Sequence, residues 1–121
     1  MKKRKLIILL VITIALCFDG CNLFNKKKFD VNMLPGYWQS GTLHEYYNAN
    51  GTGYTWDTAD DVTEEEAQPF NWTLDEATLT QNHLMEMGGI VPKTYTLKTL
   101  NTTTLVYQDD YGKSYTFNKQ P

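Results

Sequence analysis

Few residues of this 121-residue chain have the types and the spacing that catalysis requires. Beyond residue 20 the sequence holds two serines, Ser40 and Ser114, two histidines and one cysteine. It has no Gly-x-Ser-x-Gly nucleophile elbow, and a nucleophile of this kind must be activated by a neighbouring base. The sequence therefore predicts no nucleophilic triad, and we expect a protein that is not an enzyme.

Metal ligation has few candidate groups. His44 with Glu45, or His83 with Glu86, could contact a metal ion, but two histidines without a dense ligand set are more often ordinary surface or rim residues. The acidic stretch 57–66 could gather Ca²⁺, yet it lacks the spacing and the central glycine of an EF-hand. We expect a solvated loop there, with no metal and no cofactor.

Two pairs of adjacent carboxylates, at residues 75–76 and 109–110, are the candidates for general acid and base chemistry. Both pairs fall at predicted turns, where an Asp side chain accepts hydrogen bonds from nearby backbone. Neighbouring residues on a strand would also point to opposite faces of a sheet. The pattern favours turn formation over catalysis.

The N-terminus reads as a targeting segment. A basic start at residues 2–5 precedes residues 6–18, a run of 13 residues in which only Thr13 is polar. This pattern is typical of a signal peptide. A transmembrane helix is the alternative, but the run falls short of the roughly 20 residues that cross a bilayer, and Asp19 ends it. We assign residues 1–20 to a signal peptide.

The position of Cys21 indicates what kind of signal this is. Cys21 follows Gly20 at the end of the apolar run, and the stretch resembles the lipobox of bacterial lipoproteins. Phe18 and Asp19 depart from the usual aliphatic and small residues, and Cys17 fits less well because a leucine precedes it. The resemblance implies lipidation of Cys21 and a membrane anchor, with residues 21–33 as a lipidated tether. A Cys17–Cys21 disulfide is the competing possibility, but it would lie in or beside the signal helix.

Charge separates the tether from the rest of the chain. Cleavage before Cys21 would remove four of the 11 basic and one of the 14 acidic residues, which leaves a net charge of −6 and no arginine. That balance argues against nucleic-acid binding. Three lysines at 26–28 follow the expected anchor. They could meet anionic lipid headgroups or form a solvated spacer, and they favour an outer-membrane protein that faces the periplasm.

The body of the chain reads as a series of short strands separated by turns. Asn50-Gly51 is a strong hairpin signal, and Thr63 with Glu66 has the spacing of a capping box that could start one helical turn. The eight expected strands are 37–41, 42–48, 52–57, 70–74, 78–84, 91–100, 103–108 and 113–118.

Alternation along these strands indicates how they assemble. The phrases at 54–56, 95–97 and 115–117 each place two large apolar groups on one face and Thr on the other. One aromatic face and one face rich in Thr and Asn predict a closed or nearly closed antiparallel sheet over residues 34–121.

Gly36-Tyr37-Trp38 adds a family resemblance to this pattern. With 45–54, 70–74 and the ending 95–117, it resembles the small lipocalin-like domains of bacterial lipoproteins. The resemblance implies an all-β, up-and-down antiparallel barrel of about eight short strands, with Trp38 across its closed end. A ligand site would lie at the open end. In larger lipocalins an Arg near the last strand covers this Trp, whereas only Lys113 and Lys119 are present here.

An eight-stranded barrel has room either for packed side chains or for one small ligand. The side chains expected to face inward could fill the interior themselves or line a ligand site, and Tyr or Trp would bring a donor that needs a partner. These ligand-lining candidates are Trp38, Tyr54, Trp56, Phe70, Trp72, Tyr95, Tyr107, Tyr115 and Phe117.

We therefore expect a lipid-anchored bacterial envelope protein whose barrel binds a small apolar or amphipathic molecule without catalysis. A neutral ligand is favoured over a fatty acid because no Arg is present to hold a carboxylate. The alternative is a protein-interaction or inhibitor module with a filled barrel, whose acidic loop at 57–66 docks on a basic partner.

Overall fold

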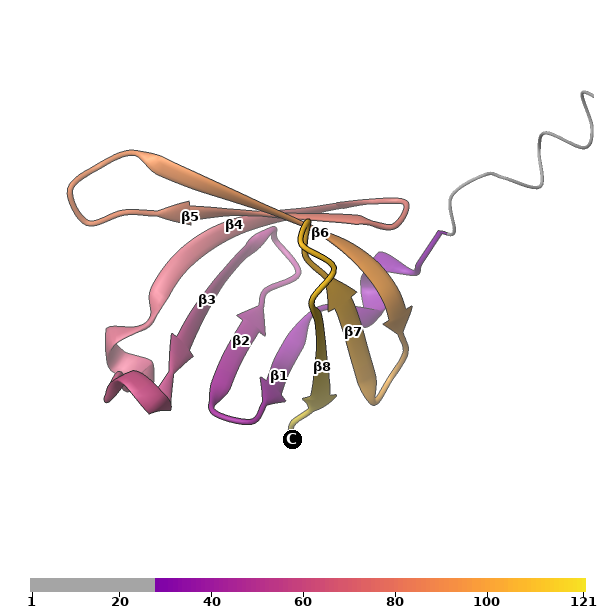
Figure 1. The fold of residues 1–121 in the computed structure, drawn as a ribbon, viewed down its shortest axis with the longest axis horizontal. Helices are drawn as coiled ribbons and strands as arrows, with labels where there is room; N and C mark the ends of the chain where they lie inside the picture. The colour runs from indigo at the N-terminus through magenta and orange to yellow at the C-terminus, as the bar shows by residue number, and fades with distance from the viewer. Residues whose placement is uncertain (1–27) are drawn as a thin grey trace, which may run out of the picture.

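The computed structural model describes residues 28–121. The expected signal peptide, the expected lipidation at Cys21 and most of the expected tether therefore lie outside the described residues. The rest forms one closed barrel in which every strand pairs with its neighbours in chain order (Figure 1). The strands are β1 (Gly36–Ser40), β2 (Leu43–Tyr47), β3 (Thr52–Asp57), β4 (Gln68–Asp75), β5 (Thr78–Leu84), β6 (Ile90–Leu100), β7 (Thr104–Gln108) and β8 (Ser114–Lys119).

All eight strand pairs are antiparallel, so the expected all-β up-and-down barrel is confirmed. The strands expected at 52–57 and 78–84 have the same bounds in the structure, and the others differ by at most two residues at an end. Alternation is the physical reason for this agreement. Along β5 and β7 every second residue is buried, as expected for a strand with one face inside the barrel.

In the described part of the chain, three short 3₁₀ helices accompany the strands: η2 (Val31–Met33), η3 (Thr58–Asp60) and η4 (Glu64–Glu66). The single turn of η4 begins with the expected capping box, in which the backbone N–H of Thr63 donates to Glu66 Oε1 at 3.4 Å. The Asn50-Gly51 turn also forms, and Gly51 adopts a φ of 89° that glycine tolerates better than other residues. Within residues 28–121, no helix is both long enough and apolar enough to cross a membrane.

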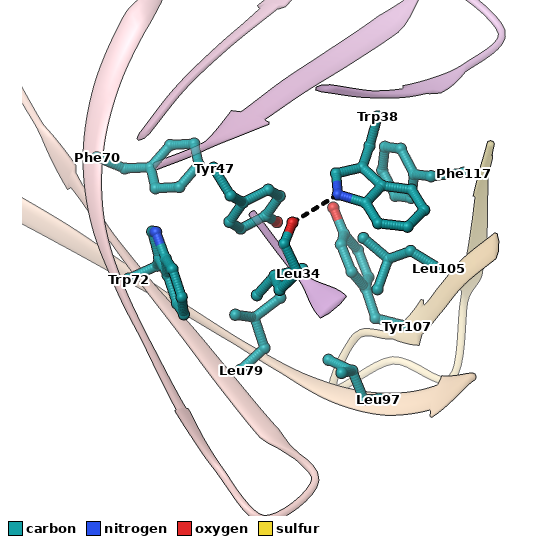
Figure 2. Close-up of a cluster of buried hydrophobic side chains, with 10 residues drawn as sticks. All are labelled: Leu34, Trp38, Tyr47, Phe70, Trp72, Leu79, Leu97, Leu105, Tyr107 and Phe117. Atoms are coloured by element: carbon teal, nitrogen blue, oxygen red, sulfur yellow. Dashed lines mark hydrogen bonds between the residues drawn. The ribbon is translucent and has the colours of Figure 1, made fainter. Parts of the chain in front are cut away.

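The two ends of the barrel differ in what fills them. One end carries the turns at 48–51, 75–77 and 101–103 together with the incoming chain, and it is packed with side chains; we call it the closed end. Figure 2 shows the cluster that fills it, with Leu34 among side chains from seven of the strands. Its members are Leu34, Trp38, Tyr47, Phe70, Trp72, Leu79, Leu97, Leu105, Tyr107 and Phe117.

Trp38 is held in the closed end by two neighbours, Leu34 and Lys119. Its Nε1–H donates to the backbone oxygen of Leu34 at 2.7 Å (Figure 2). Lys119 Nζ lies 4.6 Å from the centroid of the Trp38 ring and donates to the backbone oxygen of Pro35 at 2.7 Å. Lys119 on the last strand thus lies over the tryptophan ring in a cation–π contact.

Gly36 is needed for that contact. Its φ is 133°, which other residues rarely adopt, and a Cβ there would lie 2.5 Å from Lys119 Cε. The glycine of the Gly-x-Trp start therefore leaves the space through which the Lys119 side chain passes.

Candidate functional site

The opposite end of the barrel, which we call the open end, encloses a cavity. This end carries the turns at 41–42, 58–67, 85–89 and 109–113. The cavity has a volume of about 460 Å³, within the range of small-molecule sites. Its lining residues are Leu43, Glu45, Thr55, Trp56, Asp57, Asp60, Val62, Glu66, Gln68, Gln81, His83, Lys93, Tyr95, Tyr107 and Tyr115.

The residues of β3 explain why space remains at this end. Tyr54 and Trp56 were expected to point inward, but they lie on the outer face of the barrel. Trp56 pairs with His44 across β2 and β3, and the two rings stack with centroids 4.7 Å apart. Tyr54 stacks in the same way on Tyr46, at 5.2 Å. Because the side-chain period of a strand is 2, the small residues of β3 then face the interior.

Glu45 lies at the inner end of the cavity and is only 3% exposed. Its Oε1 accepts a hydrogen bond from the Tyr47 hydroxyl at 2.7 Å, and its Oε2 accepts one from the Tyr107 hydroxyl at 3.0 Å. Gln81 Nε2 approaches both oxygens at longer distances, 3.5 and 3.4 Å. These donors come from β2, β5 and β7, so the folded barrel as a whole positions the carboxyl group.

Hydrogen bonds continue from Glu45 along the cavity wall. Gln81 Nε2 donates to the Tyr47 hydroxyl at 2.6 Å, and Gln81 Oε1 lies 2.8 Å from His83 Nε2. The other ring nitrogen of His83 lies 2.8 Å from Gln68 Oε1. A connected polar chain therefore crosses from β2 to β4 inside the barrel. Within residues 28–121, no buried side-chain nitrogen or oxygen lacks a hydrogen-bond partner.

Burial favours the neutral forms of Glu45 and His83, the two ionisable groups of this hydrogen-bonded network. It raises the pKa of Glu45 above its ordinary value, and the hydrogen bonds that Glu45 accepts oppose that rise. It lowers the pKa of His83 to about 4, with a smaller contribution from the charge of Lys93. His83 is thus a neutral hydrogen-bonding group at physiological pH.

Aromatic and acidic groups surround the outer part of the cavity. Tyr95 stacks on Tyr107 with ring centroids 4.1 Å apart, and Tyr115 packs beside them. Asp60 and Glu66 reach the cavity from the acidic loop, which therefore forms part of the site. The wall thus combines ring surfaces with carboxylates and one lysine, Lys93, and it can hold an amphipathic molecule.

The nine ligand-lining candidates separate into three groups. Tyr95, Tyr107 and Tyr115 border the cavity, and Trp56 also contributes to its border although its ring stacks on His44 at the outer face of β3. Trp38, Phe70, Trp72 and Phe117 pack in the closed-end cluster, and Tyr107 belongs to that cluster as well. Tyr54 lies outside the barrel, where it borders a shallow depression beside Glu64 and Glu65.

Sequence reasoning missed the polar residues of the cavity. His83 was expected at the surface or rim, but it is 3% exposed and lies inside the barrel. A signal was present, because Gln81 and His83 alternate in step with the buried Leu79 and so share its face. Glu45 likewise shares a face with Tyr47.

Two of the acidic residues considered for catalysis or metal binding accept hydrogen bonds from nearby backbone. Asp109 Oδ1 accepts hydrogen bonds from the backbone N–H groups of Tyr111 and Lys113, which confirms its turn-forming role. Asp57 likewise accepts one from the backbone of Ala59 and caps η3. Over the described range 28–121, no three His, Cys, Asp or Glu side chains gather in a way that could hold a metal ion.

Comparisons of the chain with protein-family models, with curated proteins and with solved structures find no match. The chemistry of the site is therefore inferred from its own geometry.

Proposed function

We propose that this protein is a lipid-anchored envelope lipoprotein of bacteria whose lipocalin-like barrel binds a small amphipathic molecule without catalysis. The observation that carries the proposal is the cavity of about 460 Å³ at the open end, bordered by both rings and polar groups. A barrel filled throughout by its own side chains would offer no such space.

The composition of the wall favours an amphipathic ligand over a purely apolar one. Gln81 and Glu45 are buried polar groups that face the cavity, and an apolar ligand would remove them further from water without giving them a new partner. Tyr95 and Tyr115 offer ring surface for an apolar part of the ligand. The cavity wall therefore offers polar groups to the polar part of an amphipathic molecule and ring surfaces to its apolar part.

The closed end supports the lipocalin-like part of the proposal. A Gly-x-Trp start, a tryptophan packed across one end and a basic residue over its ring are the features that the resemblance implies. Lys119 takes the role of that basic residue, over Trp38. The cation–π contact and the hydrogen bond to Pro35 join the first strand to the last.

The direction of the chain supports an anchored arrangement. The chain enters at the closed end, where Phe29 packs against the core cluster. A lipid on Cys21 would hold this end near the membrane and leave the open end toward the periplasm. Cys21→Ala should give an uncleaved, unacylated precursor by mass spectrometry of the membrane fraction. Normal processing of this variant would refute the anchor.

Filling the cavity tests the binding function. Thr55→Phe places a ring in the cavity from β3, whereas Thr73→Phe places the same ring on the exposed outer face of β4. An environment-sensitive lipophilic dye should bind the wild type and Thr73→Phe equally, and Thr55→Phe at least tenfold more weakly, a difference of about 1.4 kcal/mol. Equal dye binding by all three proteins would mean that the cavity is not the site.

The protein-interaction module is the second candidate, and the exposure of the acidic loop favours it. Glu64, Glu65 and Glu66 are all exposed on η4. Native mass spectrometry after gentle purification separates the two functions. A co-purifying small molecule supports the ligand-binding barrel, whereas an empty barrel that binds no dye would support the docking module.

A further inference from the structure

We propose that the ligand is a small organic cation, such as a protonated amine, held in the cavity with Glu45 as its counter-charge. This inference rests on the proposed binding function and names the class of its ligand. The sequence favoured a neutral ligand because no arginine is present. The structure shows instead a buried carboxyl group in the cavity, Glu45, which can pair with a cation.

The hydrogen bonding of Glu45 leaves room for another donor. A carboxylate offers about four lone-pair sites. The two short hydrogen bonds, from Tyr47 and Tyr107, go to different oxygens, so each oxygen has one well-formed partner within the protein. Gln81 adds only the two long contacts. An ammonium group in the cavity could therefore donate to either oxygen without displacing a tyrosine.

The electrostatic setting gives a cation a reason to bind there. The three groups that donate to Glu45 are two phenols and an amide, all neutral. An ionised carboxylate buried among neutral partners is costly, and a cation beside it offsets that cost. Burial raises the pKa of Glu45, and the charge of Lys93 is the weakest of the influences that oppose this rise. The resident lysine thus compensates the carboxylate little.

The aromatic groups suit the same ligand. The rings of Tyr95, Tyr107 and Tyr115 stand together on the cavity wall. Tyrosine rings attract cations through the negative charge of their faces. Lys113 Nζ lies 5.0 Å from the centroid of the Tyr115 ring, so one of these rings already accepts a cation from the protein itself.

The charges that border the cavity also favour a cationic ligand. Asp57, Asp60 and Glu66 border the cavity together with Glu45, against the single lysine Lys93. Carboxylates lining a cleft raise the local concentration of cations and repel anions. A ligand carboxylate would meet this repulsion, and a neutral ligand would gain nothing from it.

Three probes with the same ring and similar chain length but different charge test the proposal: 2-phenylethylamine, 2-phenylethanol and phenylacetate. Isothermal titration calorimetry at pH 7 should show the amine binding at least tenfold more tightly than the alcohol, with phenylacetate the weakest. A hydrogen bond to a charged group contributes about 1.5 to 3 kcal/mol, which corresponds to roughly ten- to a hundredfold in affinity.

Two variants test whether the preference for the amine depends on the charge of Glu45. Glu45→Gln keeps the size and one acceptor but removes the charge, so it should weaken amine binding at least tenfold and leave alcohol binding within twofold. Glu76→Gln removes an exposed charge in the turn at the closed end, away from the cavity, and should leave amine binding unchanged. Circular dichroism and urea unfolding check that each variant is folded, and Glu45→Gln should be at least as stable as the wild type because it buries no charge.

The outcomes separate this inference from the proposed function. If the alcohol binds as tightly as the amine, or if Glu45→Gln binds both unchanged, the cation assignment is overturned while the barrel remains a binding protein. If no probe binds but the lipophilic dye does, the cation assignment also fails alone. If neither the probes nor the dye bind, both proposals fail.

Discussion

Glu45 and His83 are two ends of the same hydrogen-bonded chain, and burial favours the neutral form of each. Their effects on stability have opposite signs. The folded-state pKa of Glu45 is raised, so the stability it contributes is present at low pH and is lost as the pH rises through that pKa. The pKa of His83 is lowered to about 4, so its contribution is present above 6.5 and is lost as the pH falls through about 4.

His83→Gln should therefore reduce the acid sensitivity of the fold. In the wild type, the unfolded chain takes up a proton at His83 before the folded protein does, and folding becomes less favourable as the pH falls. Between pH 7 and pH 4.5 the variant should lose about 2 kcal/mol less stability than the wild type, measured by urea unfolding at both values. Glu45 is present in both proteins, so its contribution cancels in the comparison. Equal losses would show that His83 titrates alike in the folded and unfolded chains.

The β2–β3 hairpin shows how one element shapes both faces of the barrel wall. Outside, rings stack across the two strands, and the Tyr37 hydroxyl lies 2.7 Å from His44 Nδ1. Inside, Gly53 lies opposite Tyr47 and next to the ring of Phe70. Small inward residues on β3 thus leave space for large rings from its neighbours and, further along, for the cavity.

Gly53→Ala should destabilise the barrel because the interior at this point has no spare volume. A Cβ on Gly53 would lie 2.7 Å from ring atoms of Phe70 and also against the backbone oxygen of Tyr46. Overpacking of this kind costs about 2 to 3 kcal/mol, which thermal or urea unfolding would measure. Gly41→Ala is the matched control, since nothing lies within 4 Å of its Cβ and only its left-handed φ of 59° opposes alanine. Equal losses in the two variants would contradict the packing argument.

The barrel as a whole depends on the seam where its last strand meets its first. Only two residue pairs join β1 and β8, Trp38 with Lys119 and Gln39 with Asn118. In Figure 1 β8 lies between β1 and β7, so this seam converts an open meander into a closed barrel. The backbone N–H of Gln120 also donates a hydrogen bond to the backbone oxygen of Tyr37 at 2.8 Å. Closure pairs the first and last strands with each other, so neither is left as a terminal strand with a wholly unpaired edge.

Removal of residues 119–121 should weaken the whole fold. The deletion takes away the Lys119 contact with Trp38, its hydrogen bond to Pro35 and the backbone hydrogen bond of Gln120. Together these contribute about 3 kcal/mol, so urea unfolding should shift by that amount, and amides of β1 should exchange faster with deuterium. Removal of the exposed Pro121 alone is the control and should change neither measurement. Unchanged exchange in β1 after the larger deletion would mean that the seam does not hold the barrel closed.

The positions of the strands were predictable because the signals that set them are local. Alternation along β5 and β7, the Asn50-Gly51 turn and the capping box at Thr63 each depend on residues within a few positions of one another. The one-sided alternation predicted a closed or nearly closed antiparallel sheet, and the up-and-down barrel was what the resemblance to small lipocalin-like domains implied. The sequence by itself thus determined the elements and their order around the barrel.

The tertiary structure decided which face of β3 points inward and what lies inside. Tyr54 and Trp56 are as apolar as the residues that fill the core, and their alternation fits either face, so only the register with β2 placed them outside. The site depends on contacts between residues that lie even farther apart in the sequence. Tyr107 reaches Glu45 across 62 residues of sequence and Gln81 reaches it across 36, and only a closed barrel brings three strands around one carboxyl group.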